Sequence, residues 1–220
     1  MLIDFTLCTK LIELTHGTKV RKIYHIGAHE GEEVNIYDQN TVTDVIWFEA
    51  NISLIEKLKQ HIDSFKIRQS IVPCALWHED SVLDFHVTNN PQSSSFFVLS
   101  KHSDYYPNIT VHKTEKIKTY RLDTLINRNP KILPWFDFDF LNIDTQGAEL
   151  SILKGLGSYL DADSLKGIYL EINSEALYKN IPLVDEIDDF LRQHGFFRVL
   201  TKWWAGHGWG DGFYLRARTF

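Results

Sequence analysis

The sequence has little that would mark a secreted, membrane or zinc-binding protein. Its only two cysteines, Cys8 and Cys74, are far apart and form no CxxC motif, so neither a disulfide framework nor a cysteine zinc site is expected. No apolar run approaches the roughly 18 residues that a membrane helix requires. The first residues carry Asp4 and Glu13 instead of a basic leader followed by an apolar stretch. We therefore expect a cytoplasmic protein with reduced thiols and no membrane span.

Positive charge is also scarce. The 23 Lys and Arg residues are outnumbered by 29 Asp and Glu residues, which gives a formal net charge of -6. Affinity for nucleic acid depends on clustered Lys and Arg, so we expect no nucleic-acid partner. The sequence also lacks an Asn/Asp-Pro-Pro-Tyr motif for holding a flipped base. The length of 220 residues predicts one domain over residues 1–220.

The order of apolar patterns predicts an α/β protein. Helical spacing over residues 2–15, followed by Gly17, predicts a leading helix within residues 1–20. Strand, turn and helix patterns then follow over residues 22–40 and again over residues 42–62, and a third strand is predicted over residues 66–73. This alternation implies parallel strands joined by right-handed crossovers, as in a doubly wound sheet.

The second half of the chain interrupts this rhythm and then resumes it. A half-exposed strand is predicted over residues 81–89, and residues 89–120 read as an excursion over one face of the sheet, close to the acceptor site. We expect an edge strand over residues 110–122. Further elements follow in chain order: a helix at 122–128, a buried strand at 136–144, a helix at 146–156, a strand at 166–173, a helix at 182–195 and a terminal hairpin at 196–204 and 212–218.

The turn after the first strand is the place to look for a ligand, because doubly wound sheets bind ligands beyond the carboxyl ends of their strands. Gly27 and Gly31 in GAHEG permit a close approach of the backbone to a ligand. Glu49 ends the next strand, where an acid accepts hydrogen bonds from a ribose diol. Each feature also has a plainer interpretation, a tight turn and an exposed strand-end carboxylate. The absence of GxGxxG favours S-adenosylmethionine over NAD, because the methyl donor has no pyrophosphate.

Four segments in order, GAHEG, FEA, NIDTQGAELSILKGL and YLEIN, resemble the FkbM family of methyltransferases over roughly residues 22–217. The resemblance implies a Rossmann-like class I methyltransferase fold with a seven-stranded, mostly parallel sheet whose terminal strand is antiparallel. It also implies methyl transfer from S-adenosylmethionine to a hydroxyl of a sugar or polyketide-like acceptor. The chain departs from the family at His25, where an Asp is usual, and at His29, where an Asn is frequent.

The resemblance also implies the residues that hold the donor. The turn would line its methionine portion, Glu49 would hold the ribose, and Ala75 and Leu76 would flank the adenine, although core packing is the alternative for these last two. The predicted cofactor-binding residues are Gly27, Ala28, His29, Gly31, Glu49, Ala50, Asn51, Ala75, Leu76 and Asp144.

Acids at strand ends are the candidates for chemistry. Asp144 closes a buried strand and is expected to act as a base or a metal ligand, and it could also cap the following helix. Glu171 ends the neighbouring strand and Asn173 follows it. Asp144, Glu171 and Asn173 loosely resemble the Mg²⁺ site of catechol-type O-methyltransferases, so Mg²⁺ or another divalent cation is a candidate cofactor. Otherwise Glu171 would orient acceptor hydroxyls, and Glu149 would support the loop.

The loop AGHGWGD of the terminal hairpin is expected at the rim of the ligand crevice. It would bring His207, Trp209 and Asp211 there, beside Trp203 and Trp204. Aromatic rings present apolar faces to sugars, although Trp in a terminal hairpin is often core or edge cover. The predicted catalytic residues are thus Asp144, Glu171 and His207.

The sequence therefore predicts an S-adenosylmethionine-dependent O-methyltransferase that acts on a hydroxyl of a sugar or glycan. Three alternatives stay open. The acceptor could be a non-sugar small-molecule hydroxyl, the fold could serve a nucleotide-linked oxidoreductase, or the domain could be a noncatalytic interaction module.

Overall fold

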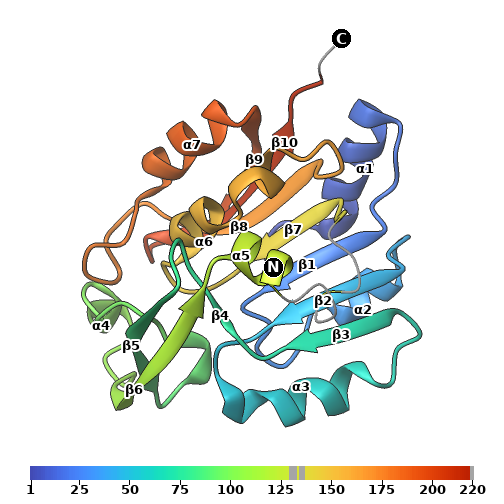
Figure 1. Ribbon diagram of the computed structural model, residues 1–220. Coiled ribbons are helices and arrows are strands. Elements are labelled where there is room, and N and C mark those ends of the chain that lie inside the picture. Colours follow the sequence, from blue (N-terminus) through green and yellow to red (C-terminus); the bar gives the residue numbers. More distant parts are fainter. Residues whose placement is uncertain (129–132, 134–136, 219–220) are drawn as a thin grey trace.

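The computed structural model describes residues 1–128, 133 and 137–218, and a seven-stranded sheet runs through its centre (Figure 1). The strand order is β3-β2-β1-β7-β8-β10-β9. The first five strands in this order are parallel, and β10 is antiparallel to both of its neighbours. The predicted mostly parallel sheet with an antiparallel terminal strand is confirmed. The strand bounds are β1 Lys22–Ile26, β2 Asp44–Phe48, β3 Arg68–Val72, β7 Phe140–Ile143, β8 Gly167–Asn173, β9 Phe196–Trp203 and β10 Trp209–Arg216.

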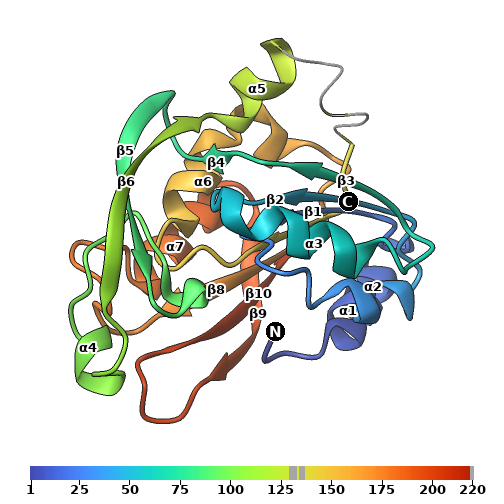
Figure 2. The same ribbon diagram turned by 90° about the horizontal axis from the view of Figure 1, so that it is seen from below.

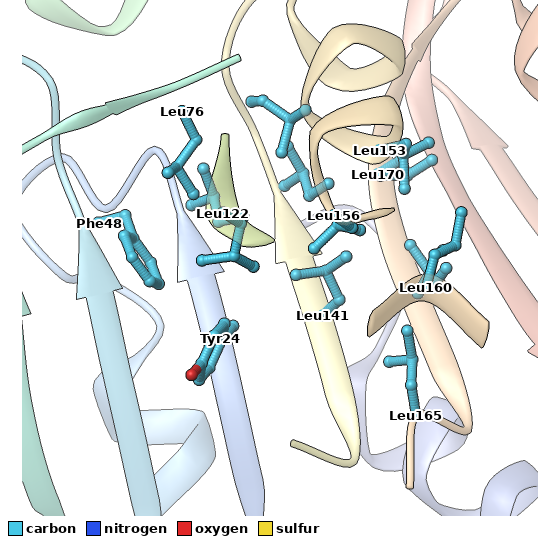
Figure 3. Packing of buried hydrophobic residues seen from close by; sticks show 14 of the residues in the cluster. Tyr24, Phe48, Leu76, Leu122, Leu141, Leu153, Leu156, Leu160, Leu165 and Leu170 are labelled. Carbon is cyan, nitrogen blue, oxygen red and sulfur yellow. The ribbon is translucent and has the colours of Figure 1, made fainter. Parts of the chain in front are cut away.

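Helices cover both faces of this sheet. On one face, α1 (Phe5–His16), α2 (Val34–Asp38) and α3 (Ile55–Ile62) bury apolar side chains against the strands. On the other, α5 (Leu122–Arg128), α6 (Glu149–Gly155) and α7 (Val184–Gln193) do the same. Figure 3 shows leucines of α6 packed over the strands around Leu141. This double cover explains why the parallel strands read as nearly continuous apolar runs.

The ends of the helices follow local rules of the sequence. The side chain of Asp4 accepts a hydrogen bond from the Thr6 amide at the start of α1, and Gly17, with φ of 70°, ends that helix in the left-handed region. The helix predicted over residues 146–156 begins only at Glu149, because Gln146 and Gly147 both have positive φ. The strand predicted over residues 136–144 is observed from Phe140. Residue 136, the first residue of the predicted strand, lies outside the described residues.

The parallel strands end in register, and this alignment creates the site. His25 of β1 lies opposite Trp47 of β2 and Asn142 of β7. The residues that follow these three strands therefore emerge at the same edge of the sheet. Strand order also reverses between β1 and β7 at this edge, which is where doubly wound sheets bind ligands.

A second, three-stranded sheet stands beside the large one (Figure 2). It consists of β4 (Ala75–Leu76), β5 (Ser81–Thr88) and β6 (Val111–Tyr120) in the order β4-β6-β5. The expectation of an edge strand over residues 110–122 was wrong: β6 is the central strand of this small sheet, because β5 pairs with it antiparallel and β4 pairs with its other side. The short helix α4 (His102–Tyr105) lies between β5 and β6 along the chain.

The remaining elements are three short 3-10 turns, η1 (Ile52–Leu54), η2 (Pro91–Ser93) and η3 (Gly157–Asp161). Cys8 and Cys74 are both free thiols. Within the part of the chain that the structure describes, no helix is both long enough and apolar enough to cross a bilayer.

Candidate active site

A cavity of about 540 Å³ opens at the carboxyl ends of the parallel strands. Gly27, Glu49, Asp144 and Glu171 line it, and each comes from the end of a different strand of the sheet. A volume of this size is typical of sites for small molecules and cofactors. The cavity extends from the turn after β1 to the small helix α4 and the β9–β10 hairpin.

The turn after β1 is fixed by close backbone packing. Gly27 has φ of 84°, and a Cβ atom at this position would lie 1.9 Å from the carbonyl oxygen of Asp144. The amides of Gly27 and Ala28 both donate to the carbonyl of Phe48, at 3.0 Å each. A side chain at residue 27 would therefore push β1 away from the end of β7, so glycine is required here.

Glu49 connects two loops of the cavity. Its Oε2 accepts a hydrogen bond of 2.8 Å from the His29 amide, and its Oε1 accepts one of 2.7 Å from the Asn51 amide. The side chain is buried and faces the cavity, and burial raises its pKa against the effect of these hydrogen bonds. Each carboxylate oxygen still has a lone pair available for a hydroxyl donor. The geometry thus suits a diol bound at the end of β2.

An apolar compartment lies next to Glu49. Its wall includes the buried side chains of Ala75 and Leu76 from β4 and Leu54 from η1. Phe85 and Phe96 of the small sheet region complete it, with their ring centroids 5.0 Å apart. A flat, mostly apolar ring fits such a compartment.

The turn also carries an ion pair. His29 Nδ1 lies 2.6 Å from Glu32 Oε1, and this contact raises the pKa of the imidazole. Burial acts to raise the pKa of Glu32, but hydrogen bonds from His29 and from the backbone outweigh it and bring the value to about 2. His29 has φ of 47°, an uncommon conformation for a residue with a side chain.

Beneath the turn, His25 belongs to a buried hydrogen-bond network. Its Nδ1 lies 3.0 Å from the Tyr37 hydroxyl, which also accepts a 2.9 Å hydrogen bond from Asn142 Nδ2. Burial lowers the pKa of His25, so the ring is neutral at pH 7. The chain therefore has a neutral group in the cavity wall where an Asp is usual in the FkbM family.

Acidic side chains gather at the ends of β7, β8 and β10. Glu171 and Asp211 are buried and lie opposite each other on paired strands, and Asp144 is open to the cavity. Desolvation by the surrounding protein, followed by repulsion from Asp211 and Glu149, raises the pKa of Asp144 to about 7. Burial, followed by Asp144, raises the pKa of Glu171 well above its usual value. Both burial and the neighbouring carboxylates therefore disfavour the charged forms of Asp144 and Glu171.

No lysine or arginine among the described residues lines this cavity. The acids that line it are Glu32, Glu33, Glu49, Asp144, Glu171 and Asp211. A cationic ligand would relieve their mutual repulsion, whereas an anionic ligand would increase it.

Gln146 connects the acids to the segment after β8. Its Nε2 donates to Glu171 at 2.7 Å and to Asp144 at 3.3 Å, and its Oε1 accepts a 2.7 Å hydrogen bond from the Tyr178 hydroxyl. Its backbone has φ of 57°, and its carbonyl accepts from Ser95 Oγ at 2.7 Å. Glu149 holds the same loop by accepting hydrogen bonds from the amides of Thr145 and Gly147, as expected from the sequence.

At the far end of the cavity, α4 meets the β9–β10 hairpin (Figure 2). His102, Tyr106 and Trp209 line the cavity here. The Trp209 indole N–H donates to the Tyr106 hydroxyl at 3.3 Å. The ring of His207 stacks on Tyr106 with centroids 5.5 Å apart, and Trp204 stacks on Trp209 at 5.7 Å. This end of the cavity is aromatic and lacks the acids of its centre.

The structure brings most of the predicted site residues to one cavity. Three predicted residues lie elsewhere. His207 packs behind Tyr106, Asn173 lies beyond the cavity wall with its Oδ1 unpartnered, and Gly31 packs against Leu58 and Ile62. The predicted residues that line the cavity are Gly27, Ala28, His29, Glu49, Ala50, Asn51, Ala75, Leu76, Asp144 and Glu171.

The predicted metal set is only partly assembled. Asp144 and Glu171 share the cavity, but Asn173 does not line it. In the described residues, no three His, Cys, Asp or Glu side chains are placed to hold a metal ion. Among these described residues, the predicted ligand set for a divalent cation is therefore incomplete.

Among the cavity residues that the sequence did not predict, His102 and Gln146 are the most informative. His102 was one of three imidazoles in irregular segments, and nothing in its neighbours along the chain distinguished it from His112 or His207. Gln146 stands inside the family signature, but only its positive φ aims its side chain between the acids.

Comparison with solved structures shows the class I methyltransferase fold. TrmK of M. capricolum, solved in complex with S-adenosylhomocysteine, has a TM-score of 0.50 and 10% identity, with 98% of this chain and 70% of TrmK covered. Precorrin-6y C5,15-methyltransferase from Geobacter metallireducens has a TM-score of 0.51 and 11% identity, with 99% and 91% covered. Identities this low show the shared fold alone.

Comparison of the sequence gives the family. No curated protein matches the chain. Residues 25–197, well over half of the sequence, match the methyltransferase FkbM domain, and this span contains the turn after β1, Glu49, Asp144 and Glu171. On this evidence the chain belongs to the FkbM family of methyltransferases.

Proposed function

We propose that this protein transfers the methyl group of S-adenosylmethionine to a hydroxyl of a sugar or glycan. One observation carries the proposal: acids line the cavity without any lysine or arginine among the described residues, and one of them, Glu49, is oriented for a ribose diol. The donor combines a ribose with a positively charged sulfur. Glu49 suits the ribose, and the acids of the cavity suit the positive charge.

The charge of the cavity separates this donor from a dinucleotide. NAD carries a diphosphate, and a diphosphate beside Asp144 and Glu171 would add negative charge where carboxyl pKa values are already raised. Dinucleotide sites instead provide a glycine-rich turn at a helix N-terminus. The methyl donor adds positive charge, so the acids favour it.

The residues of the cavity have separate roles in this reaction. Glu49 holds the ribose, the apolar compartment around Leu76 and Phe85 takes the adenine, and the turn at Gly27 takes the methionine portion. When bound, the donor supplies a methyl group on a sulfonium. Asp144 accepts the proton of the attacking hydroxyl while the oxygen–carbon bond forms and the carbon–sulfur bond breaks, with its electron pair left on sulfur.

The raised pKa of Asp144, about 7, suits a base that works near neutral pH. Glu171 is held in place by a hydrogen bond from Gln146, and burial raises its pKa, so the carboxyl group is positioned to orient an acceptor hydroxyl. A sugar acceptor is favoured by the aromatic end of the cavity, where Tyr106 and Trp209 present ring faces. A small non-sugar alcohol is the alternative acceptor.

Two measurements test the proposal. S-adenosylhomocysteine and S-adenosylmethionine should each raise the melting temperature, because a ligand that binds only the native state stabilises it, and NAD should not. Transfer of a radiolabelled methyl group should then be measured with methyl glycosides and, in parallel, with non-sugar alcohols. Stabilisation by NAD alone would refute the donor, and labelling of non-sugar alcohols alone would refute the sugar. Repeating the assay with a chelator tests whether the reaction needs the divalent cation that the sequence made a candidate.

A further inference from the structure

The aromatic end of the cavity continues outward as a step of stacked rings. Trp209 lines the cavity, and Trp204 stacks on it with an interplanar angle of 13° and is 46% exposed. Trp203, the preceding residue and the last of β9, is also exposed, and neither Trp203 nor Trp204 lines the cavity itself. The stacked indoles thus extend outward from a ring that lines the cavity to one that is exposed.

The inner part of this surface is held rigidly. The Trp209 indole is fixed by its hydrogen bond to the Tyr106 hydroxyl, and the other side of Tyr106 is covered by His207. The helix α4 is anchored to the segment after β8 by hydrogen bonds from the amides of Ser100 and His102 to the carbonyl of Leu177. Rigid aromatic faces bind the C–H faces of sugar rings at little entropic cost.

His102 adds a polar group that the protein itself does not satisfy. The side chain is 4% exposed and lines the cavity, and its Nδ1 is buried without a hydrogen-bond partner. Its ring packs 4.9 Å from Tyr106 and 5.4 Å from Tyr178. A buried nitrogen without a partner costs free energy, and a small adjustment that lets a ligand hydroxyl reach it would recover that cost.

We infer that the acceptor is a glycoside of at least two units, with its terminal sugar against Trp209, Tyr106 and His102 and its next unit over Trp204. The inference rests on the proposed function and deepens it, because it names which part of a glycan enters the cavity. The terminal ring lies between the aromatic end and the acids, so one of its hydroxyls faces Asp144. The second unit leaves across the exposed indole.

The chemistry of each contact supports this order. The sugar C–H face packs on the indole of Trp209, and a ring hydroxyl donates to His102. Tyr178 stands between His102 and Gln146, and Gln146 reaches Glu171, so the contacts run without interruption from the sugar site to the acids. The exposed face of Trp204 offers an apolar surface for a second ring but no enclosing wall.

The test measures methyl transfer to a methyl monosaccharide and to the corresponding methyl disaccharide. Trp209→Ala and Tyr106→Ala should raise KM for both acceptors by about tenfold or more, with S-adenosylhomocysteine affinity unchanged. Trp204→Ala should raise KM more for the disaccharide than for the monosaccharide. Trp203→Ala is the matched control, since this exposed tryptophan adjoins Trp204 in the chain but it is Trp204 that stacks on Trp209, and Trp203→Ala should change neither KM.

A second pair of variants tests His102. In asparagine, the amide oxygen is as many bonds from Cβ as Nδ1 is in histidine, so His102→Asn keeps an acceptor near that position. His102→Leu fills similar space without an acceptor. The asparagine variant should retain a lower KM than the leucine variant. Trp209→Phe, which keeps an aromatic face, and thermal unfolding of every variant separate a lost contact from a lost fold.

The outcomes are distinct. Glycosides that are methylated with KM unaffected by all these variants would overturn the inference and leave the proposed function standing. Equal effects of Trp204→Ala on both acceptors would overturn the position of the second unit. A protein that binds S-adenosylhomocysteine but methylates no glycoside would overturn the sugar acceptor, and with it this inference.

Discussion

The cavity has two halves under the proposed function: a donor half around Glu49 and the turn after β1, and a second half around Asp144, Glu171 and His102. They differ in how completely the protein satisfies its own polar groups. In the donor half, Glu49 accepts two backbone hydrogen bonds and His29 pairs with Glu32. In the other half, neighbouring carboxylates add to burial in raising the pKa values of Asp144 and Glu171, and the buried Nδ1 of His102 has no partner. Under the proposed function, the donor half is preorganised by its own backbone, whereas the second half leaves polar groups for its ligands to satisfy.

This difference has a structural origin. The donor half is made from backbone turns at the ends of β1 and β2, where amides supply the hydrogen bonds. The second half is made from side chains of four separate segments, the loop after β7, β8, α4 and the β9–β10 hairpin. Catalysis requires groups that interact more strongly with the transition state than with the resting site, so unsatisfied groups belong where the chemistry occurs.

The largest expected effect comes from removing the base in the unsatisfied half. Asp144→Asn should lower kcat by about 10²- to 10⁴-fold, the usual contribution of a positioned general base. Donor affinity should change far less, because the ribose contacts lie in the other half. Steady-state kinetics and calorimetry with S-adenosylhomocysteine measure the two quantities. A variant with near-normal kcat would show that Asp144 is not the base.

A change in the donor half should act on folding and binding together. Gly27→Ala places a Cβ 1.9 Å from the Asp144 carbonyl oxygen and strains a φ of 84°. We expect a loss of at least about 2 kcal/mol in the free energy of unfolding and weaker donor binding. Gly206→Ala is the matched control, because Gly206 has φ of 78° but nothing within 4 Å of the added atom. Urea unfolding of the two variants measures the loss of stability in each. Equal losses would contradict the packing argument.

Removal of the ribose contact should weaken the donor alone. Glu49→Ala should reduce affinity for S-adenosylhomocysteine by roughly 10- to 100-fold, since hydrogen bonds to a charged group contribute about 1.5–3 kcal/mol. The exposed Glu56 is the control, and Glu56→Ala should leave affinity unchanged. Calorimetric titration of both variants decides the point. An unaltered dissociation constant for Glu49→Ala would remove Glu49 from the donor site.

The smallest effect concerns pH. Glu171 has a pKa of about 4.3 when unfolded, and burial raises it well above that in the folded protein. The folded state therefore keeps a proton that the unfolded state has lost, so stability decreases as pH rises above about 4.3, until the folded pKa is passed. Glu171→Gln, which mimics the protonated acid, should make this decrease less steep. Unfolding measured from about pH 5 to about pH 8 tests it, with the exposed Asp38→Asn as control. Identical pH dependence in wild type and Glu171→Gln would refute the shift.

Much of the donor half could be predicted from the sequence because each of its residues follows directly after a buried strand. Gly27 and Glu49 each close such a run, as Asp144 does at the border of the other half, and parallel strands bring their ends to one edge. The second half could not be predicted in the same way. The place of His102 depends on α4 packing against the hairpin, and that contact joins residues about a hundred positions apart.

The pairing of strands was likewise not predictable from local patterns. The exposed pattern of β6 indicated a strand but not its neighbours, and the structure gives it a partner on each side. Gly31 shows that a correct motif can have a different role: its lack of a side chain makes room for Leu58 and Ile62 of α3. In each case the deciding contact is between distant parts of the chain, which local patterns do not specify.

The proposed methyl transfer requires a single adenosyl group lying between Glu49 and Asp144. A crystal structure of the protein soaked with S-adenosylhomocysteine tests this directly. We predict both ribose hydroxyls within hydrogen-bond distance of the Glu49 carboxylate, the adenine against Leu76, and the sulfur facing Asp144. A ligand whose ribose lies away from Glu49, or whose sulfur points away from the acids, would contradict it.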